Sequence, residues 1–276
     1  MVARRRARAA GPGGGGRRFA AAGAGCLASM VAAQVASGVR PDPVRWTGPV
    51  VGLLTAGAGC FAASRLGAGR AAGAVGAAAA LGYAAEWVGV RTGVPFGRYS
   101  YTGVLRPQVG GVPAAVAAAW AGMGLASHAV AATLVPDGRR WTRVAVGASA
   151  LTAWDLFLDP QMTRLDLWRW ARRGAYRGVP ASNFAGWLAA SALLTGAVDA
   201  LVGPGRDVAE GLVATYAVMA VMETVAFAAV FRPRDPLVAA AGGTAMGAFA
   251  VPAAVLAARR RTAAARAGGG DGRWPR

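Results

Sequence analysis

Apolar runs alternate with short polar segments along almost the entire chain. The runs predicted to form membrane spans cover residues 19–39, 47–64, 71–90, 111–136, 144–158, 181–202, 211–231 and 237–258. Most of them are close to the ~20 residues that an α-helix needs to cross the hydrocarbon core of a bilayer. The second run is weakly apolar and the fifth is short, so a count of seven spans stays open. The pattern predicts an all-α fold, a polytopic integral membrane protein with about eight transmembrane helices.

The two ends of the chain depart from this pattern. Residues 1–18 and 259–276 are rich in arginine, glycine and alanine, a composition typical of disordered tails. Residues 19–258 between them are predicted to be a single transmembrane helical domain. The first apolar run is longer than the core of a cleaved signal peptide, so we expect it to be retained. Because the first helix and its flanks usually dominate orientation, both tails are expected on the cytoplasmic side of a multi-pass protein of the cell membrane.

The formal net charge is +18, and all 30 basic residues are arginine. Six arginines lie in each tail and the others interrupt apolar runs, so no soluble basic domain is left to bind nucleic acid. We expect no nucleic-acid partner, because basic tails beside membrane spans instead attract anionic lipid. Cys26 and Cys60 lie inside apolar runs and His128 is the one histidine, so neither a disulfide framework nor a metal centre is expected.

Several polar side chains lie inside or at the ends of the predicted spans. A charged residue there costs ~2.5–3.5 kcal/mol on insertion scales, which makes it a candidate functional group. The alternation of spans directs five such residues toward one side of the membrane, from which the longer loops 91–110 and 159–180 also emerge. These five are Glu86, Asp155, Asp159, Asn183 and Glu223. His128 and Asp199 are expected nearer the opposite side, as satisfied structural groups.

Asp155 and Asp159 are four residues apart, so they share one helix face if the helix extends that far. Two neighbouring carboxylates cannot both ionise cheaply in a low-dielectric setting, and a protonated carboxyl beside an ionised one can perform acid–base chemistry. The competing interpretation is helix capping or pairing with Arg164. Pro160 is expected to end the helix directly after the pair.

Aromatic side chains follow Glu86 in the first of the longer loops. The tight turns of residues 92–103 are expected to hold Phe96, Tyr99 and Tyr101 near the membrane interface. Such rings commonly anchor helices at headgroup level. They can also stabilise a carbocation by cation–π contact, worth ~2 kcal/mol or more when desolvated. Both roles stay open for this loop.

The second longer loop is also aromatic and basic. Residues 162–176 are expected to form an interfacial helix, with Trp168 and Trp170 pointing inward and arginines pointing outward. Trp120, inside the fourth apolar run, is expected to have a packing role.

Three strings in this region resemble a known family. Glu86 with FGRYSYTG (96–103), AWDLFLDPQM (153–162) and GAYRGVPASNFAGW (174–187) resemble membrane carotenoid biosynthesis proteins that include the CruF-type carotenoid hydratases. The resemblance implies an enzyme of the hydro-lyase type that adds water across the terminal C=C of an acyclic (ψ) carotenoid end group. It implies a carotenoid dissolved in the membrane as substrate and other enzymes of carotenoid biosynthesis as partners. No cofactor is expected.

The hypothesis assigns roles to the polar and aromatic residues. The catalytic candidates are Glu86, Asp155 and Asp159. The substrate-binding candidates are Phe96, Tyr99, Tyr101, Trp154, Asn183 and Glu223. Two other classes of protein stay open: a membrane transporter or carotenoid-binding scaffold without catalysis, and a carotenoid cyclase, which shares the protonation step. An alcohol product would indicate a hydratase, an isomer a cyclase, and an unchanged carotenoid a transporter or scaffold.

Overall fold

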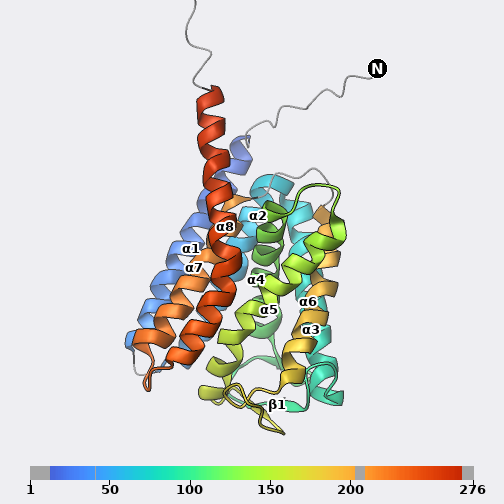
Figure 1. Ribbon diagram of the computed structural model, residues 1–276, viewed down its shortest axis with the longest axis vertical. Coiled ribbons are helices and arrows are strands. Elements are labelled where there is room, and N and C mark those ends of the chain that lie inside the picture. The colour runs from blue at the N-terminus through green and yellow to red at the C-terminus, as the bar shows by residue number, and fades with distance from the viewer. Residues whose placement is uncertain (1–12, 41, 203–208, 269–276) are drawn as a thin grey trace, which may run out of the picture.

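The computed structural model describes residues 13–40, 42–202 and 209–268, and long helices dominate this part of the chain (Figure 1). The helices are α1 (Gly14–Val39), α2 (Thr47–Leu66), α3 (Ala68–Thr92), α4 (Ala114–Leu134), α5 (Arg140–Arg164), α6 (Ala181–Val202), α7 (Glu210–Val225) and α8 (Pro236–Gly268). A short 3₁₀-helix (Val44–Trp46) precedes α2, and a π-helical turn, η2 (Ala226–Val230), continues α7. The prediction of an all-α fold is confirmed.

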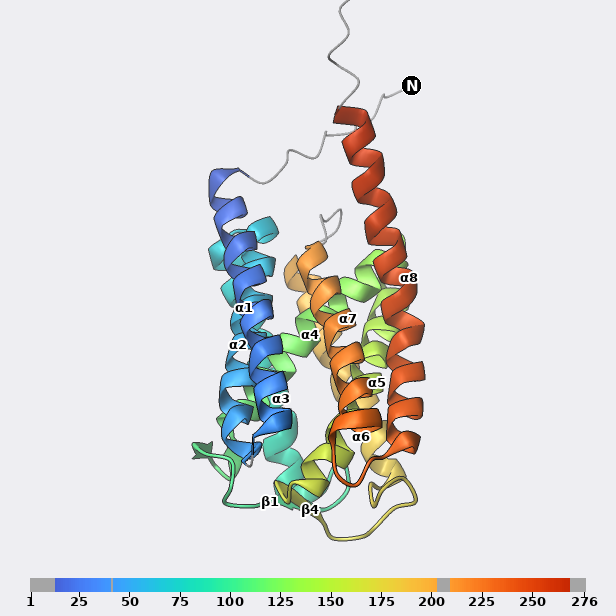
Figure 2. The ribbon, with the colours of Figure 1, turned by 90° about the vertical axis from the view of Figure 1, so that its left-hand side faces the viewer.

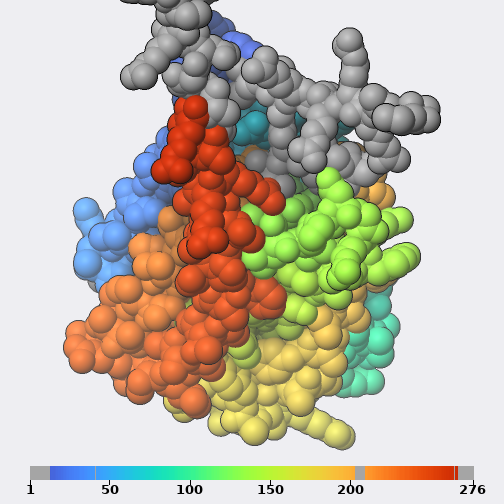
Figure 3. All heavy atoms as spheres, turned by 45° about the horizontal axis from the view of Figure 1, so that its top comes forward, coloured from blue at the N-terminus to red at the C-terminus, as the bar shows by residue number. Residues whose placement is uncertain are grey.

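The eight helices form one bundle in which α1 begins and α8 ends at the same end (Figures 1 and 2). Figure 3, which brings this end forward, shows α8 on the surface between α7 and α5. Seven of them are long and apolar enough to cross a membrane, which makes the chain a multi-pass membrane protein. The helix that falls short is α5, because it carries several charged residues. The most buried span is that of α4, where 78% of the apolar window lies inside the protein. The bundle is therefore built around α4.

The first and last helices are longer than the sequence predicted. The first begins at Gly14 instead of residue 19, and α8 continues past residue 258 to Gly268. The residues added to α8 are mostly arginine and alanine, both of which are strong helix formers, whereas those added to α1 are three glycines and two arginines. The rest of the two predicted disordered tails, residues 1–12 and 269–276, lies outside the described residues.

Pro160 does not end α5, so that expectation is wrong. Proline has no N–H, and inside a helix it leaves the carbonyl four residues earlier without its partner. The carbonyl affected here belongs to Leu156, and the Tyr176 hydroxyl donates a hydrogen bond to it at 2.9 Å. This side chain from the following loop lets α5 continue to Arg164 and keeps Asp159 in the helix.

The expected interfacial helix over 162–176 is also wrong. Strand β4 (Trp168–Trp170) lies there and pairs antiparallel with β1 (Tyr99–Tyr101) of the other longer loop. The sequences YSY and WRW alternate aromatic and polar residues, which is the period of a strand rather than of a helix. A second small ribbon joins β2 (Gln108–Val109) to β3 (Val112–Pro113). The prediction that both longer loops emerge on one side is confirmed by the pairing of β1 with β4 at one end of the bundle (Figure 2).

Candidate active site

The β1–β4 ribbon directs its aromatic side chains toward the helices. Register pairs Tyr99 with Trp170 and Tyr101 with Trp168, and their ring centroids lie 5.1 Å and 5.6 Å apart, respectively. Ser100, between the tyrosines, is exposed on the other face of the ribbon. We call the four rings the aromatic cap.

The aromatic cap lies against Glu86, a buried carboxylate of α3. Its Oε2 accepts hydrogen bonds from the hydroxyls of Tyr99 and Tyr101, the latter at 2.8 Å. Its Oε1 accepts a third from Trp120 Nε1 at 3.0 Å. Burial, followed by the nearby carboxylate, raises the pKa of both tyrosines, so the two hydroxyls stay protonated as donors. Three donors and no acceptor match an ionised carboxylate, which can only accept hydrogen bonds.

Trp120 has more than the packing role that the sequence suggested. Gly82, one turn before Glu86 on α3, makes room for it, because a β-carbon at this position would overlap the indole. The Trp120 ring stacks on Trp187 of α6 at 4.1 Å, and Trp154 of α5 meets Trp187 edge-on at 6.2 Å. We call Trp120, Trp154 and Trp187 the tryptophan wall. The spacing of Gly82 and Glu86 was a sequence signal for a large partner at this point on α3.

Asp155, Asp159 and Asn183 form a second buried group. The Asn183 Nδ2 donates to Oδ2 of Asp155 at 2.7 Å and also to Oδ2 of Asp159. Both N–H bonds of the amide are thereby used. The Oδ1 atoms of the two aspartates have no hydrogen-bond partner among the described residues. Two carboxyls on one amide, with free oxygens in a dry setting, are an arrangement that can hold a single proton between them.

Two cavities adjoin the tryptophan wall. The smaller, about 60 Å³, has Glu86 and all three tryptophans in its lining. The larger, about 310 Å³, is lined mainly by apolar side chains of α1, α2, α5 and α7. The carboxylate Glu223 also lines it. Trp154 and Leu158 line both cavities, so the two spaces are neighbours. Asp155 and Asp159 are not among the residues that line either one.

The remaining predicted site residues divide between these places. Phe96 packs beneath the aromatic cap against Gly89 and Gly186, where a β-carbon would collide with its ring. Glu223 lies in the wall of the larger cavity and makes no hydrogen bond with its carboxylate among the described residues. The predicted convergence therefore brings Glu86 to the cap and Asn183 to the two aspartates, whereas Glu223 faces separate apolar space. No group of three His, Cys, Asp or Glu side chains able to hold a metal ion is found in the described ranges.

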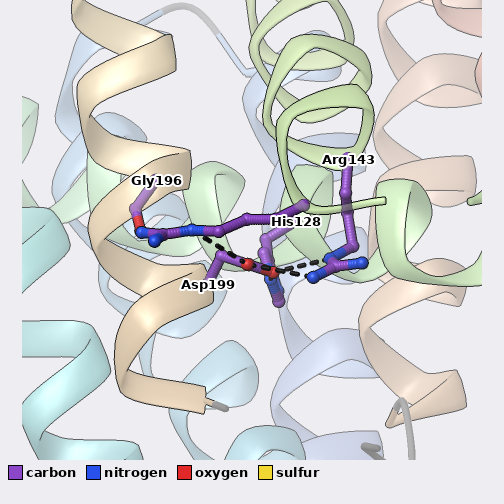
Figure 4. Close-up of polar contacts among 5 residues, drawn as sticks. His128, Arg143, Gly196 and Asp199 are labelled. Carbon is purple, nitrogen blue, oxygen red and sulfur yellow. Dashed lines mark hydrogen bonds and ion pairs between the residues drawn. The ribbon is translucent and has the colours of Figure 1, made fainter. Parts of the chain in front are cut away.

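A separate polar cluster lies near the other end of α5 and α6 (Figure 4). Arg143 Nε and Nη2 contact the two carboxylate oxygens of Asp199 at 2.6 Å and 3.0 Å, respectively. The Nε2 of His128 lies 3.1 Å from Asp199 Oδ1, and Arg140 Nε lies 3.7 Å from Oδ2. Two arginines of α5 thus face the one aspartate of α6, and His128 of α4 contacts it as well.

Fold and site together define a polytopic membrane protein with carboxylates buried beside apolar cavities. Residues 47–250, more than half of the chain, match the profile of a family described as carotenoid biosynthesis protein. The chain belongs to that family, and its role is in carotenoid biosynthesis.

A curated relative is similar to a large part of the chain. It is the bisanhydrobacterioruberin hydratase of Haloarcula japonica, 32% identical over 176 residues. The aligned region covers 60% of this chain and 57% of the relative, so the chain spans little more than half of that protein's length. No solved structure matches the chain.

Proposed function

We propose that the protein is a carotenoid hydratase of the cell membrane that adds water across the terminal C=C of an acyclic (ψ) end group. The observation that carries the proposal is the Glu86 carboxylate, bound by three neutral donors at a cavity whose wall is made of tryptophan rings. Membership of a carotenoid biosynthesis family and similarity to a protein named as a hydratase support the same reaction. The substrate is dissolved in the bilayer, which the multi-pass fold suits.

The Asp155–Asp159 pair supplies the proton. It is transferred to the less substituted carbon of the alkene, so a C–H bond forms and the positive charge develops on the tertiary carbon. Trp154, next to Asp155 in the chain, belongs to the wall of the smaller cavity where the end group would lie. General acid catalysis of this kind typically contributes ~10²–10⁴-fold. Side-chain movement at Trp154 would bring the acid to the alkene.

The tryptophan wall and Glu86 act on the cation. Electron-rich ring faces stabilise a desolvated positive charge. The Glu86 carboxylate orients a water molecule and accepts its proton as the new C–O bond forms. The products are a tertiary alcohol and a proton, which returns to the aspartate pair, so the sum is the addition of H₂O without electron transfer.

The other predicted site residues hold these groups or the substrate. Tyr99 and Tyr101 are positioning residues, because their hydroxyls fix both the orientation and the charge of Glu86. Asn183 does the same for the aspartate pair. Phe96 supports the aromatic cap from beneath. Glu223 contacts the substrate in the larger cavity.

Product analysis in water enriched in heavy oxygen tests the proposal. The chain is expressed in a host that makes an acyclic carotenoid, and the pigments are analysed by mass. We expect an alcohol that carries the label, and its loss in Glu86→Gln and Asp155→Asn with the protein still inserted. An isomer without oxygen would favour a cyclase, and an unchanged carotenoid would favour a transporter or scaffold. Intact hydration in both variants would refute the carboxylate assignment.

A further inference from the structure

The larger cavity differs from the smaller one in its relation to the surface. Its lining includes residues of α1 and α7 that are largely exposed, among them Val35 at 53% and Val225 at 48%. Val39 and Val230 line the same cavity and are also exposed. These valines are apolar and lie on membrane-spanning helices, so what they face in a membrane is lipid. The cavity therefore has its mouth between α1 and the end of α7, two helices that face the viewer in Figure 2.

The mouth coincides with an irregularity of α7. The helix changes to the π-helical turn η2 at Ala226, directly after Val225. Such turns are rare and often accompany functional sites, because the widened backbone redirects side chains. On the opposite side, Gly38 of α1 lies so close to η2 that a β-carbon there would come 2.8 Å from Val230. The missing side chain at Gly38 therefore lets Val230 pack against α1 at this point.

The inner end of the cavity meets the candidate active site. Trp154, Leu158 and Met162 of α5 line both cavities, so an occupant of the larger one is separated from the Glu86 cavity by a single layer of side chains. For scale, an apolar cavity of ~150 Å³ stays dry and accepts a benzene ring. The volume of about 310 Å³ suits a longer apolar ligand better than water.

We propose that this cavity binds the acyclic part of a carotenoid chain, which enters sideways from the bilayer between α1 and the α7–η2 segment and places its end group in the smaller cavity. The polyene remains in lipid while its end group passes Val35 and Val225 and reaches the tryptophan wall. The assignment rests on the proposed function for the identity of the ligand. The position of the entrance rests on the exposed lining residues and on the π-helical turn at the end of α7.

Two variants narrow the mouth and one controls for them. Val35→Trp and Val225→Trp place an indole at the entrance from either side. Val221→Trp puts the same ring one turn away on α7, at a residue that is 60% exposed and does not line the cavity. With the carotenoid supplied in liposomes, we expect both mouth variants to slow hydration at least tenfold and the control to stay within about twofold of the wild type. Wild-type rates in both mouth variants would overturn the entrance.

A second measurement does not depend on turnover. In a background with Cys26→Ala and Cys60→Ala, a cysteine is introduced at Met222, which lines the cavity, or at Val221, which does not. We expect an acyclic carotenoid to slow alkylation by a membrane-permeant maleimide at position 222 and not at 221. Equal rates with and without carotenoid at 222 would overturn the binding site. Protection at 222 in a protein that hydrates no acyclic carotenoid would retain the site and refute the hydratase proposal instead.

Discussion

Asp155 and Asp199 are both buried carboxylates, on the neighbouring helices α5 and α6, yet their partners are of opposite kinds. Asp199 is held by Arg143 in a two-point contact and lies 3.7 Å from Arg140 Nε, so its charge is matched by cations. Asp155 meets only the neutral amide of Asn183, and no described arginine or histidine forms an ion pair with it. A buried ion pair is an ordinary structural element, whereas buried acids with only neutral partners are retained at a cost in stability. The difference separates a structural end of the bundle from the end where we propose the chemistry, called the chemical end below.

Glu86 extends the comparison. Like Asp155 it has only neutral partners, but it has three of them and the aspartate pair shares one. The numbers of donors suggest different charges at the two places, an anion at Glu86 and a shared proton at the pair. A hydratase needs both a proton donor and a group that directs water. Variants at one end or the other should therefore differ in whether they change the rate of hydration or the free energy of unfolding.

The largest effect is expected for Asp155→Asn. The amide keeps the shape and most of the hydrogen-bonding capacity but cannot supply a proton. Alcohol formation should fall by ~10²–10⁴-fold, the usual contribution of general acid–base catalysis. Unfolding in detergent should stay close to the wild type, because no cation loses its partner. A fall in activity explained entirely by loss of folded protein would contradict the assignment.

Asp199→Asn should produce the opposite result. It removes the carboxylate that the buried Arg143 contacts at two points, and breaking a buried ion pair in this way costs ~3–5 kcal/mol in the free energy of unfolding. Activity per folded molecule should be retained. The double variant Asp199→Asn with Arg143→Met removes the uncompensated charge and should recover much of the stability. Chemical denaturation in detergent measures the stability of the wild type, the single variant and the double variant. An unchanged stability of Asp199→Asn would remove the distinction between the two ends.

Tyr101→Phe should have a smaller effect on the chemical end. The ring stays in the aromatic cap, and two of the three donors to Glu86 remain. Hydrogen bonds to charged groups contribute ~1.5–3 kcal/mol, so a loss of roughly 10- to 150-fold in rate is expected. Tyr83→Phe is the matched control, because the Tyr83 hydroxyl bonds the carbonyl of Val109 and not the site. A rate for Tyr101→Phe equal to that of the control would show that Glu86 does not depend on this donor.

The fold could be predicted from the sequence more fully than the contacts within the candidate site. Hydropathy alone predicts the spans, and counting them assigns the long loops to one side, because a helix that crosses a membrane has few alternatives. The partners of the carboxylates depend on side chains that are far apart in sequence, such as Trp120 and Glu86. Neither periodicity nor composition encodes such a contact. Gly82 is a local sequence feature connected with this contact, because a missing side chain one turn from Glu86 leaves room for the Trp120 indole.

The errors at Pro160 and at residues 162–176 share one physical cause, because tertiary contacts decide the structure at both places. The strand at Trp168–Trp170 forms only because β1 is available to pair with it. Pro160 stays helical only because Tyr176 satisfies the carbonyl that proline cannot. In both cases the sequence held the required partner, but at a distance that no local pattern reveals. The position of Asp159 on the same helix as Asp155 depends on the second of these contacts.

The smallest effect is expected for Tyr176→Phe, and it tests how the chemical end of α5 is held. The change leaves the Leu156 carbonyl without its donor, which should lower the free energy of unfolding by ~1 kcal/mol. Pro160→Ala restores an N–H that can bond the same carbonyl, so in that background Tyr176→Phe should cost clearly less. A double-mutant cycle by denaturation in detergent measures the difference. Coupling between the two residues means that the hydroxyl does replace the missing helix bond. Additive effects would mean that Tyr176 acts elsewhere, for example through its edge-on contact with Phe184, and that α5 tolerates the proline without it.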